Sequence, residues 1–181
     1  MSSNEFATRS CRELVHIVSP LVRTALQKKV RYHAHLVQTA DLLAFLELSQ
    51  LGLVAMTGAV QSLQCLHTNN LSHETWGDPI KRYRNQLETY DQFFALSGAA
   101  MQDASHWREV AKRGTGHRAY WSACSHYLRG HRAVARELFK MALELDPATA
   151  VVPPVAQLMR YHHLFDRISG VLLGFIRPAK A

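Results

Sequence analysis

The sequence predicts a mainly helical fold, in which residues 1–77 form a small α/β remnant and residues 78–181 form a helical region. Three observations lead to this fold class. Apolar residues recur every three and four positions through most of the second half, which is the period of an amphipathic helix. Residues that start and stop helices flank these stretches. Strand-like patterns occur only between residues 53 and 66.

The N-terminal part is predicted to contain one strong helix followed by two short strands. Residues 41–51 are rich in leucine, and Gly52 follows them as glycine commonly follows the last turn of a helix. Residues 53–56 then form a short apolar run, and residues 60–66 alternate between apolar and polar side chains. This helix–strand–strand order gives the N-terminal part its predicted α/β character.

The second part is predicted to be helical throughout. Asp78 is a helix cap and Pro79 stands at the first helical position, where proline is favoured. The helix that they start is expected to end near residues 97–98. Further helices are predicted from Trp107 with a break at 114–116, and at 119–128, 133–145 and 155–168.

Residues 116–149 resemble a single tetratricopeptide unit, a helical hairpin of about 34 residues. The residues that carry this resemblance are Ala123, Gly130, Ala135, Phe139, Ala142 and Pro147. No second copy is found in the sequence. Because one unit cannot bury its own apolar face, it must pack on neighbouring helices. The alternative is an ordinary helical hairpin within a globular region.

The chain is basic, and this bears on its partners. Lys and Arg number 21 against 14 Asp and Glu, a formal net charge of +7, which favours anionic partners. The basic residues are scattered, as on solvated helix faces. Aromatic residues stand beside basic ones at 81–84 and 118–121, and such a pattern can bind single-stranded nucleic acid. Aromatic residues at helical spacing usually face the core, so nucleic acid is the weaker expectation.

Other classes of site and location find little support. The three cysteines, Cys11, Cys65 and Cys124, lie far apart, which favours a reducing compartment and a cytoplasmic location. No apolar stretch approaches the roughly 18 residues that would span a bilayer, which leaves only peripheral contact with a membrane. His33 and His35 lack zinc-site partners at suitable spacing. Neither a metal nor another cofactor is expected for this chain alone.

The order of the N-terminal segments resembles the end of a family 2 glycosyltransferase catalytic domain. The resemblance rests on the run at residues 39–48, on Gly52, on the two strands and on the loop that holds His67, Asn70 and Ser72. The helical region that follows, including residues 128–147, is similar to tails found in such enzymes. The resemblance implies a nucleotide-binding α/β sandwich that transfers a sugar from a nucleotide donor with a divalent metal.

The resemblance also implies roles for particular residues. Asp41 matches the general base that takes the proton of the acceptor hydroxyl, a task suited to a carboxylate. His67, Asn70 and Ser72 match the loop that closes over the donor diphosphate. The simpler alternatives are a helix cap for Asp41 and a polar turn for His67 and Asn70.

The chain departs from the family in two respects. It contains no Asp-x-Asp motif to hold the metal, and Cys65 stands where an arginine is common. The sequence therefore predicts a truncated or partial glycosyltransferase-like protein, inactive alone, whose partner is a donor-binding half or a second copy. A divalent metal is expected only with that half. The alternatives are a helical protein-interaction module and a basic nucleic-acid-binding protein.

Overall fold

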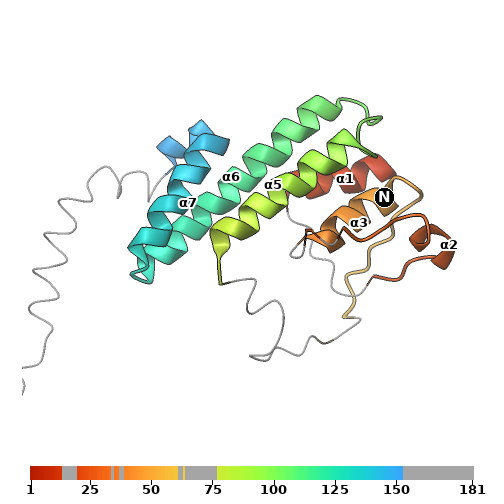
Figure 1. Ribbon diagram of the computed structural model, residues 1–181, viewed down its shortest axis with the longest axis horizontal. Coiled ribbons are helices and arrows are strands. Elements are labelled where there is room, and N and C mark those ends of the chain that lie inside the picture. Colours follow the sequence, from red (N-terminus) through yellow and green to blue (C-terminus); the bar gives the residue numbers. More distant parts are fainter. Residues whose placement is uncertain (14–19, 34, 37–38, 61–62, 64–76, 153–181) are drawn as a thin grey trace, which may run out of the picture.

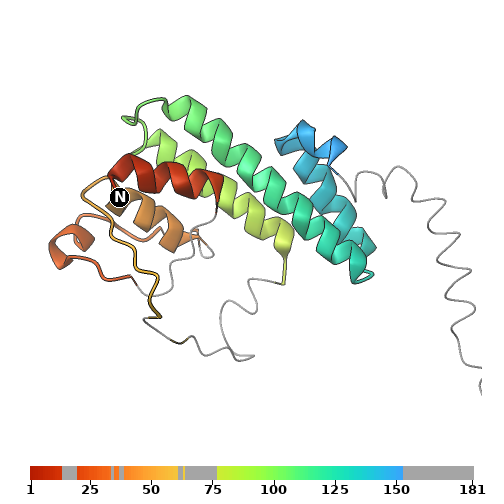
Figure 2. The ribbon, with the colours of Figure 1, turned by 180° about the vertical axis from the view of Figure 1, so that it is seen from behind.

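The computed structural model is a helical bundle, and it describes residues 1–13, 20–33, 35–36, 39–60, 63 and 77–152. Two long helices, α5 (Pro79–Ala95) and α6 (Ala104–Leu128), lie side by side, and α7 (Arg132–Leu145) packs on the second half of α6 (Figure 1). At the opposite end, α1 (Ser3–Arg12) packs on α6 and α3 (Ala40–Ser49) packs on α5 (Figure 2). The short elements are α2 (Thr24–Gln27) and η1 (Pro147–Val151). The prediction of a mainly helical fold is confirmed.

Helix α5 begins where the sequence predicts. The Asp78 carboxylate accepts hydrogen bonds from the backbone N–H groups of Ile80 and Lys81, each at 3.0 Å, and Pro79 occupies the first turn. These bonds satisfy donors that have no partner within the helix. Helix α7 agrees closely with the predicted 133–145.

Helix α6 is continuous from Ala104 to Leu128, so the break predicted at 114–116 is wrong. The glycines there permit close packing instead. A Cβ atom on Gly114 would lie 2.6 Å from the backbone oxygen of Cys11 in α1, and one on Gly116 would lie 2.9 Å from the Cβ of Leu145 in α7. Both glycines therefore let a neighbouring helix approach α6.

The first helix, α1, was not among the predicted elements. It begins with a capping box, in which the Ser2 hydroxyl accepts from the Glu5 backbone N–H and the Glu5 carboxylate accepts from the Ser2 backbone N–H. Its buried face carries Phe6, Ala7 and Cys11. The serine–glutamate spacing is a recognised start signal and is visible in the sequence.

The predicted strand at residues 53–56 is also wrong. Helix α3 forms as expected, but the segment that follows it runs without a strand partner; Val54 donates one backbone hydrogen bond to the oxygen of Met1, at 3.1 Å. Leu53 is 89% exposed, so the segment does not bury a strand face. Most of the second predicted strand, 60–66, lies outside the described residues. The described part of residues 1–77 contains helices and no strand.

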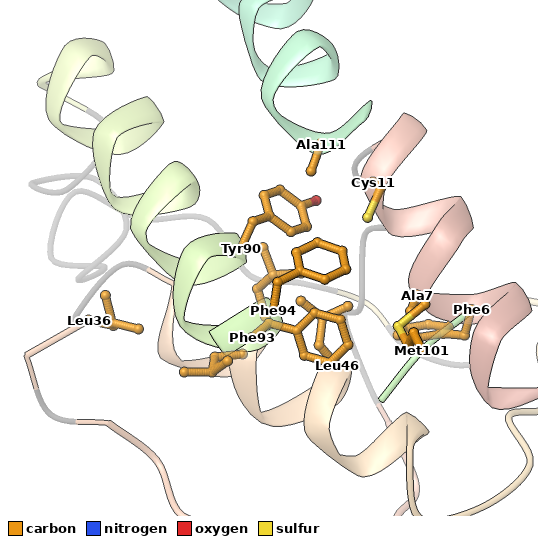
Figure 3. Close-up of a cluster of buried hydrophobic side chains, with 12 residues drawn as sticks. Phe6, Ala7, Cys11, Leu36, Leu46, Tyr90, Phe93, Phe94, Met101 and Ala111 are labelled. Carbon is orange, nitrogen blue, oxygen red and sulfur yellow. The ribbon is translucent and has the colours of Figure 1, made fainter. Parts of the chain in front are cut away.

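One apolar cluster crosses the boundary predicted at residue 77. Phe93 and Tyr90 from α5 meet Phe6 from α1, Leu46 from α3 and Ala111 from α6 (Figure 3). A second cluster joins α5, α6 and α7. It is built from Tyr83, Ala119, Tyr120, Ala123, Cys124, Leu138, Met141 and Ala142. Helices α5 and α6 contribute to both clusters. They therefore connect α1 and α3 at one end of the bundle to α7 at the other.

The hairpin predicted at 116–149 is present as α6 and α7, although its first helix extends back to Ala104. Tyr120 and Phe139 pack together across the pair, with ring centroids 6.1 Å apart. Within the described ranges, no helix is long and apolar enough to cross a membrane.

Candidate functional site

Asp41, which the resemblance assigns as a general base, lies in the first turn of α3 with its side chain exposed. Its Oδ1 accepts a hydrogen bond from the backbone N–H of Leu42, at 2.7 Å. The helix cap itself is Thr39. These contacts give Asp41 a structural role at the start of α3, where a negative charge is favoured. His67, Asn70 and Ser72 lie outside the described residues.

Arg118 of α6 is a largely buried arginine that interacts with Cys11 of α1 and Tyr90 of α5. The Arg118 Nη2 donates to the Thr115 hydroxyl at 2.9 Å, whereas Nε and Nη1 are buried without a hydrogen-bond partner. A Cβ atom on Gly114 would lie 3.4 Å from Nη1 and 2.6 Å from the backbone oxygen of Cys11, so both atoms border the same close approach of α1 to α6. Burial lowers the pKa of Arg118, while Tyr90 acts in the opposite direction. A cation is favoured at the C-terminal end of a helix, so Arg118 fits a role in docking α1.

Cys11 lies in the same region but lacks the properties of a nucleophile. Burial raises the pKa of its thiol to about 12, with a smaller opposing effect of Arg118. The thiolate is the reactive form of cysteine, and at neutral pH this thiol stays protonated. Cys11 is therefore a core residue.

The arrangement best suited to binding is a positively charged end of the bundle, formed by Arg82 of α5 with His126, Arg129 and His131 at the α6–α7 turn. We call these four residues the basic end. In both views the start of α5 lies near this turn (Figures 1 and 2). Residues 79–84 and 129–136 contain basic residues and no aspartate or glutamate.

Arg82 is held against α6 through its neighbour in sequence. Its guanidinium carbon lies 4.9 Å from the centroid of the Tyr83 ring, and Nη2 donates to the Tyr83 hydroxyl at 3.2 Å. Tyr83 is buried, and its hydroxyl donates to the backbone oxygen of Arg118 in α6, at 3.1 Å. Arg82 therefore belongs to an ordered surface.

The turn after α6 brings the two histidines together. Gly130 has a φ of +82°, a left-handed conformation that favours glycine. The N–H of His131 bonds to the oxygen of His126 at 2.9 Å, and the N–H of Gly130 bonds to the oxygen of Tyr127 at 3.0 Å. These two bonds define a Schellman motif. In this motif, the residues at the positions of His126 and His131 usually make a hydrophobic contact.

Here the contact is made by two imidazoles. The Nδ1 atoms of His126 and His131 lie 3.3 Å apart, and the ring centroids lie 5.6 Å apart. One ring can therefore donate an N–H to the other, so that the pair shares one proton between these nitrogens. Burial, followed by His131, Arg129 and Arg82, holds the pKa of His126 below its ordinary value of 6.5.

Sequence reasoning did not find this pair. The predicted helix end at residue 128 agrees with the structure, but the sequence analysis does not predict the contact between the flanking histidines. The spacing His126, Gly130, His131 is the signal, because a Schellman motif places the third residue from the helix end beside the second residue after the cap.

Two of the three aromatic residues that suggest nucleic-acid binding, Tyr83 and Tyr120, lie in the core. Tyr83 is 7% exposed and Tyr120 is fully buried. The Tyr120 hydroxyl donates to the backbone oxygen of Val152. Trp121 is half exposed, and its indole N–H donates to His117 at 3.1 Å. Most of the predicted stacking surface is therefore not available to bases.

A second group of polar side chains joins the segment before α3 to both α3 and α5. His33 Nε2 is 3.8 Å from Glu47 Oε1, and His35 Nε2 is 2.7 Å from Gln92 Nε2. Burial raises the pKa of Glu47, and His33 opposes that shift. Among the described residues, no group of three or more histidine, cysteine, aspartate or glutamate side chains is arranged to hold a metal.

Comparison with known proteins adds no relative: no family model matches the chain, and neither curated proteins nor solved structures give a significant match. The function must therefore be inferred from the geometry of the chain's own residues.

Proposed function

We propose that the protein is a helical interaction module that binds an acidic segment of a partner protein at its basic end. The observation that carries the proposal is the convergence of Arg82, His126, Arg129 and His131 from two separate parts of the chain. Their mutual proximity is unfavourable in the isolated protein, because like charges repel. An acidic partner relieves this repulsion, which is a source of binding energy and of selectivity.

A protein partner is favoured over nucleic acid by the placement of the aromatic side chains. Binding of single strands without sequence preference commonly combines a positive groove with exposed rings on which bases stack. The rings of Tyr83 and Tyr120 are buried, whereas the basic side chains of Lys81 and Arg84 are exposed. The basic end therefore offers charge without a stacking platform, which suits carboxylate side chains.

The glycosyltransferase resemblance is a hypothesis of its own, and the described residues give it no specific support. Asp41 has a sufficient role in the first turn of α3, bonded to the backbone of Leu42. The segment at residues 53–56 makes no sheet to which a donor-binding half could be joined. An interaction module needs neither feature.

Neutralising the basic end tests the proposed function. We expect the double variant Arg82→Gln and Arg129→Gln to bind a hexaglutamate peptide at least about tenfold more weakly than the natural protein at about 0.1 M salt, where the Debye length is about 10 Å. Calorimetric titration measures both affinities. Glutamine keeps part of the Arg82 packing on Tyr83 while removing the charge.

The matched control is Lys112→Gln with Arg113→Gln, which removes the same charge from exposed positions of α6. These residues lie about 20 Å along the helix from His126, at about 1.5 Å per residue. The control is expected to change affinity by less than about twofold, because surface charges beyond a Debye length are screened. Equal losses in both variants would mean that only net charge matters. Tighter binding of oligothymidylate than of hexaglutamate would favour nucleic acid.

A further inference from the structure

The strongest feature beyond the proposed function is the chemistry of the contact between His126 and His131. At these two positions of a Schellman motif an apolar pair is usual, since the contact serves only to close the turn. Two imidazoles close it here through a shared hydrogen bond, with Nδ1 atoms 3.3 Å apart. Their contact therefore depends on how many protons the two rings carry.

Proton counting gives three states of the pair. When both rings are neutral, one Nδ1 donates and the other accepts. After one proton is added, the charged ring can still donate to its neutral neighbour, and such a charge-assisted bond is stronger than a neutral one. After a second proton both Nδ1 atoms are donors, the bond is lost and two cations face each other. The contact is therefore favourable with none or one added proton and unfavourable with two.

The surroundings set where those steps occur. Burial holds the pKa of His126 down, and the charges of His131, Arg129 on the same turn and Arg82 of α5 act in the same direction. Asp78, the N-cap of α5, is already bonded to the backbone N–H groups of Ile80 and Lys81. A carboxylate brought by a partner would act in the opposite direction and favour the protonated rings.

We propose that the His126–His131 pair takes up a proton when the basic end binds an acidic peptide, so that the interaction strengthens as the pH falls. This inference rests on the proposed function and adds its regulation. A group that gains a proton on binding makes affinity depend on pH, because the two equilibria are linked reciprocally. If binding takes up a proton, affinity rises as the pH falls through the range in which that proton is taken up.

Titration of hexaglutamate at two pH values tests the proposal. Between pH 7.5 and 5.5 we expect the affinity of the natural protein to rise about tenfold, as uptake of up to one proton allows. The double variant His126→Gln with His131→Gln keeps the size and polarity of the contact but cannot titrate, and its affinity should rise less than about twofold. The control His106→Gln, at an exposed position near the start of α6, should behave like the natural protein.

The outcomes separate the two ideas. A rise in the natural protein that is lost only in the double variant supports the proposal. Binding that does not depend on pH, or that depends on pH equally in the double variant, contradicts proton uptake by the His126–His131 pair. The proposal that the basic end binds an acidic peptide would still stand. Failure of hexaglutamate to bind at either pH overturns both. Circular dichroism of each variant at both pH values checks that the helical bundle is retained.

Discussion

Replacement of Phe93 by alanine is expected to lower the free energy of unfolding by about 3–5 kcal/mol, the usual cost of removing a buried phenylalanine. Phe93 is fully buried in the cluster where α1, α3, α5 and α6 meet (Figure 3). Urea unfolding followed by circular dichroism measures the loss. Leu53→Ala is the control, since that side chain is 89% exposed and should cost less than about 0.5 kcal/mol.

The same experiment examines whether the N-terminal helices belong to the bundle. Trp107 packs against the first cluster and Trp121 contacts Tyr120 of the second, so fluorescence reports on both. Because α5 and α6 run through both clusters, one cooperative transition is expected, shifted as a whole to lower urea. Two separate transitions, with only the first affected by Phe93→Ala, would show that the clusters unfold independently.

Replacement of Gly114 by valine should cost about 2–3 kcal/mol through overpacking. A Cβ atom there would lie 2.6 Å from the backbone oxygen of Cys11 and 3.2 Å from that of Arg12, so α1 must move away from α6. Backbone oxygens cannot turn aside as a flexible side chain does. Amide hydrogen exchange of the variant should show faster exchange in α1 than in the natural protein.

Gly58→Val provides the comparison for this variant, because a Cβ at Gly58 meets nothing within 4 Å. It is expected to change stability by less than about 0.5 kcal/mol. If Gly114→Val leaves both stability and the exchange of α1 unchanged, the close approach of α1 to α6 does not exist in solution.

Local signals in the sequence predicted much of the helical part. Asp78 and Pro79 start α5 because a cap and a fixed φ act within one turn, without help from distant residues. The end of α7 before Pro147 follows from the same kind of local restriction. Such signals give the bounds of elements, and the structure agrees with them here.

The errors arose where distant contacts decide the outcome. The glycines at 114 and 116 predict a helix break from sequence alone. In the structure they make room for Cys11 and Leu145, which lie far away in the sequence. Residues 53–56 have a strand-like composition, but a strand needs a partner, and their backbone finds one bond to Met1. Neither outcome follows from composition alone.

The candidate site was within reach of sequence reasoning only in part. The Schellman motif at Gly130 predicts that His126 and His131 meet, since both positions are fixed by the turn. The position of Arg82 beside them depends on how α5 packs on α6 through Tyr83, which is a tertiary contact. The charge of the basic end therefore became apparent only from the fold.

The most direct test of the acidic-partner account is to map the binding of hexaglutamate by nuclear magnetic resonance on the isotope-labelled protein. The account predicts that the backbone amide signals that shift belong to residues 80–84 and 126–136, at the start of α5 and around the α6–α7 turn. Signals from α1 and α3, at the other end of the bundle, should stay in place. Shifts centred on Lys28, Lys29 and Arg31, or spread evenly over all basic residues, would contradict a specific binding site at the basic end.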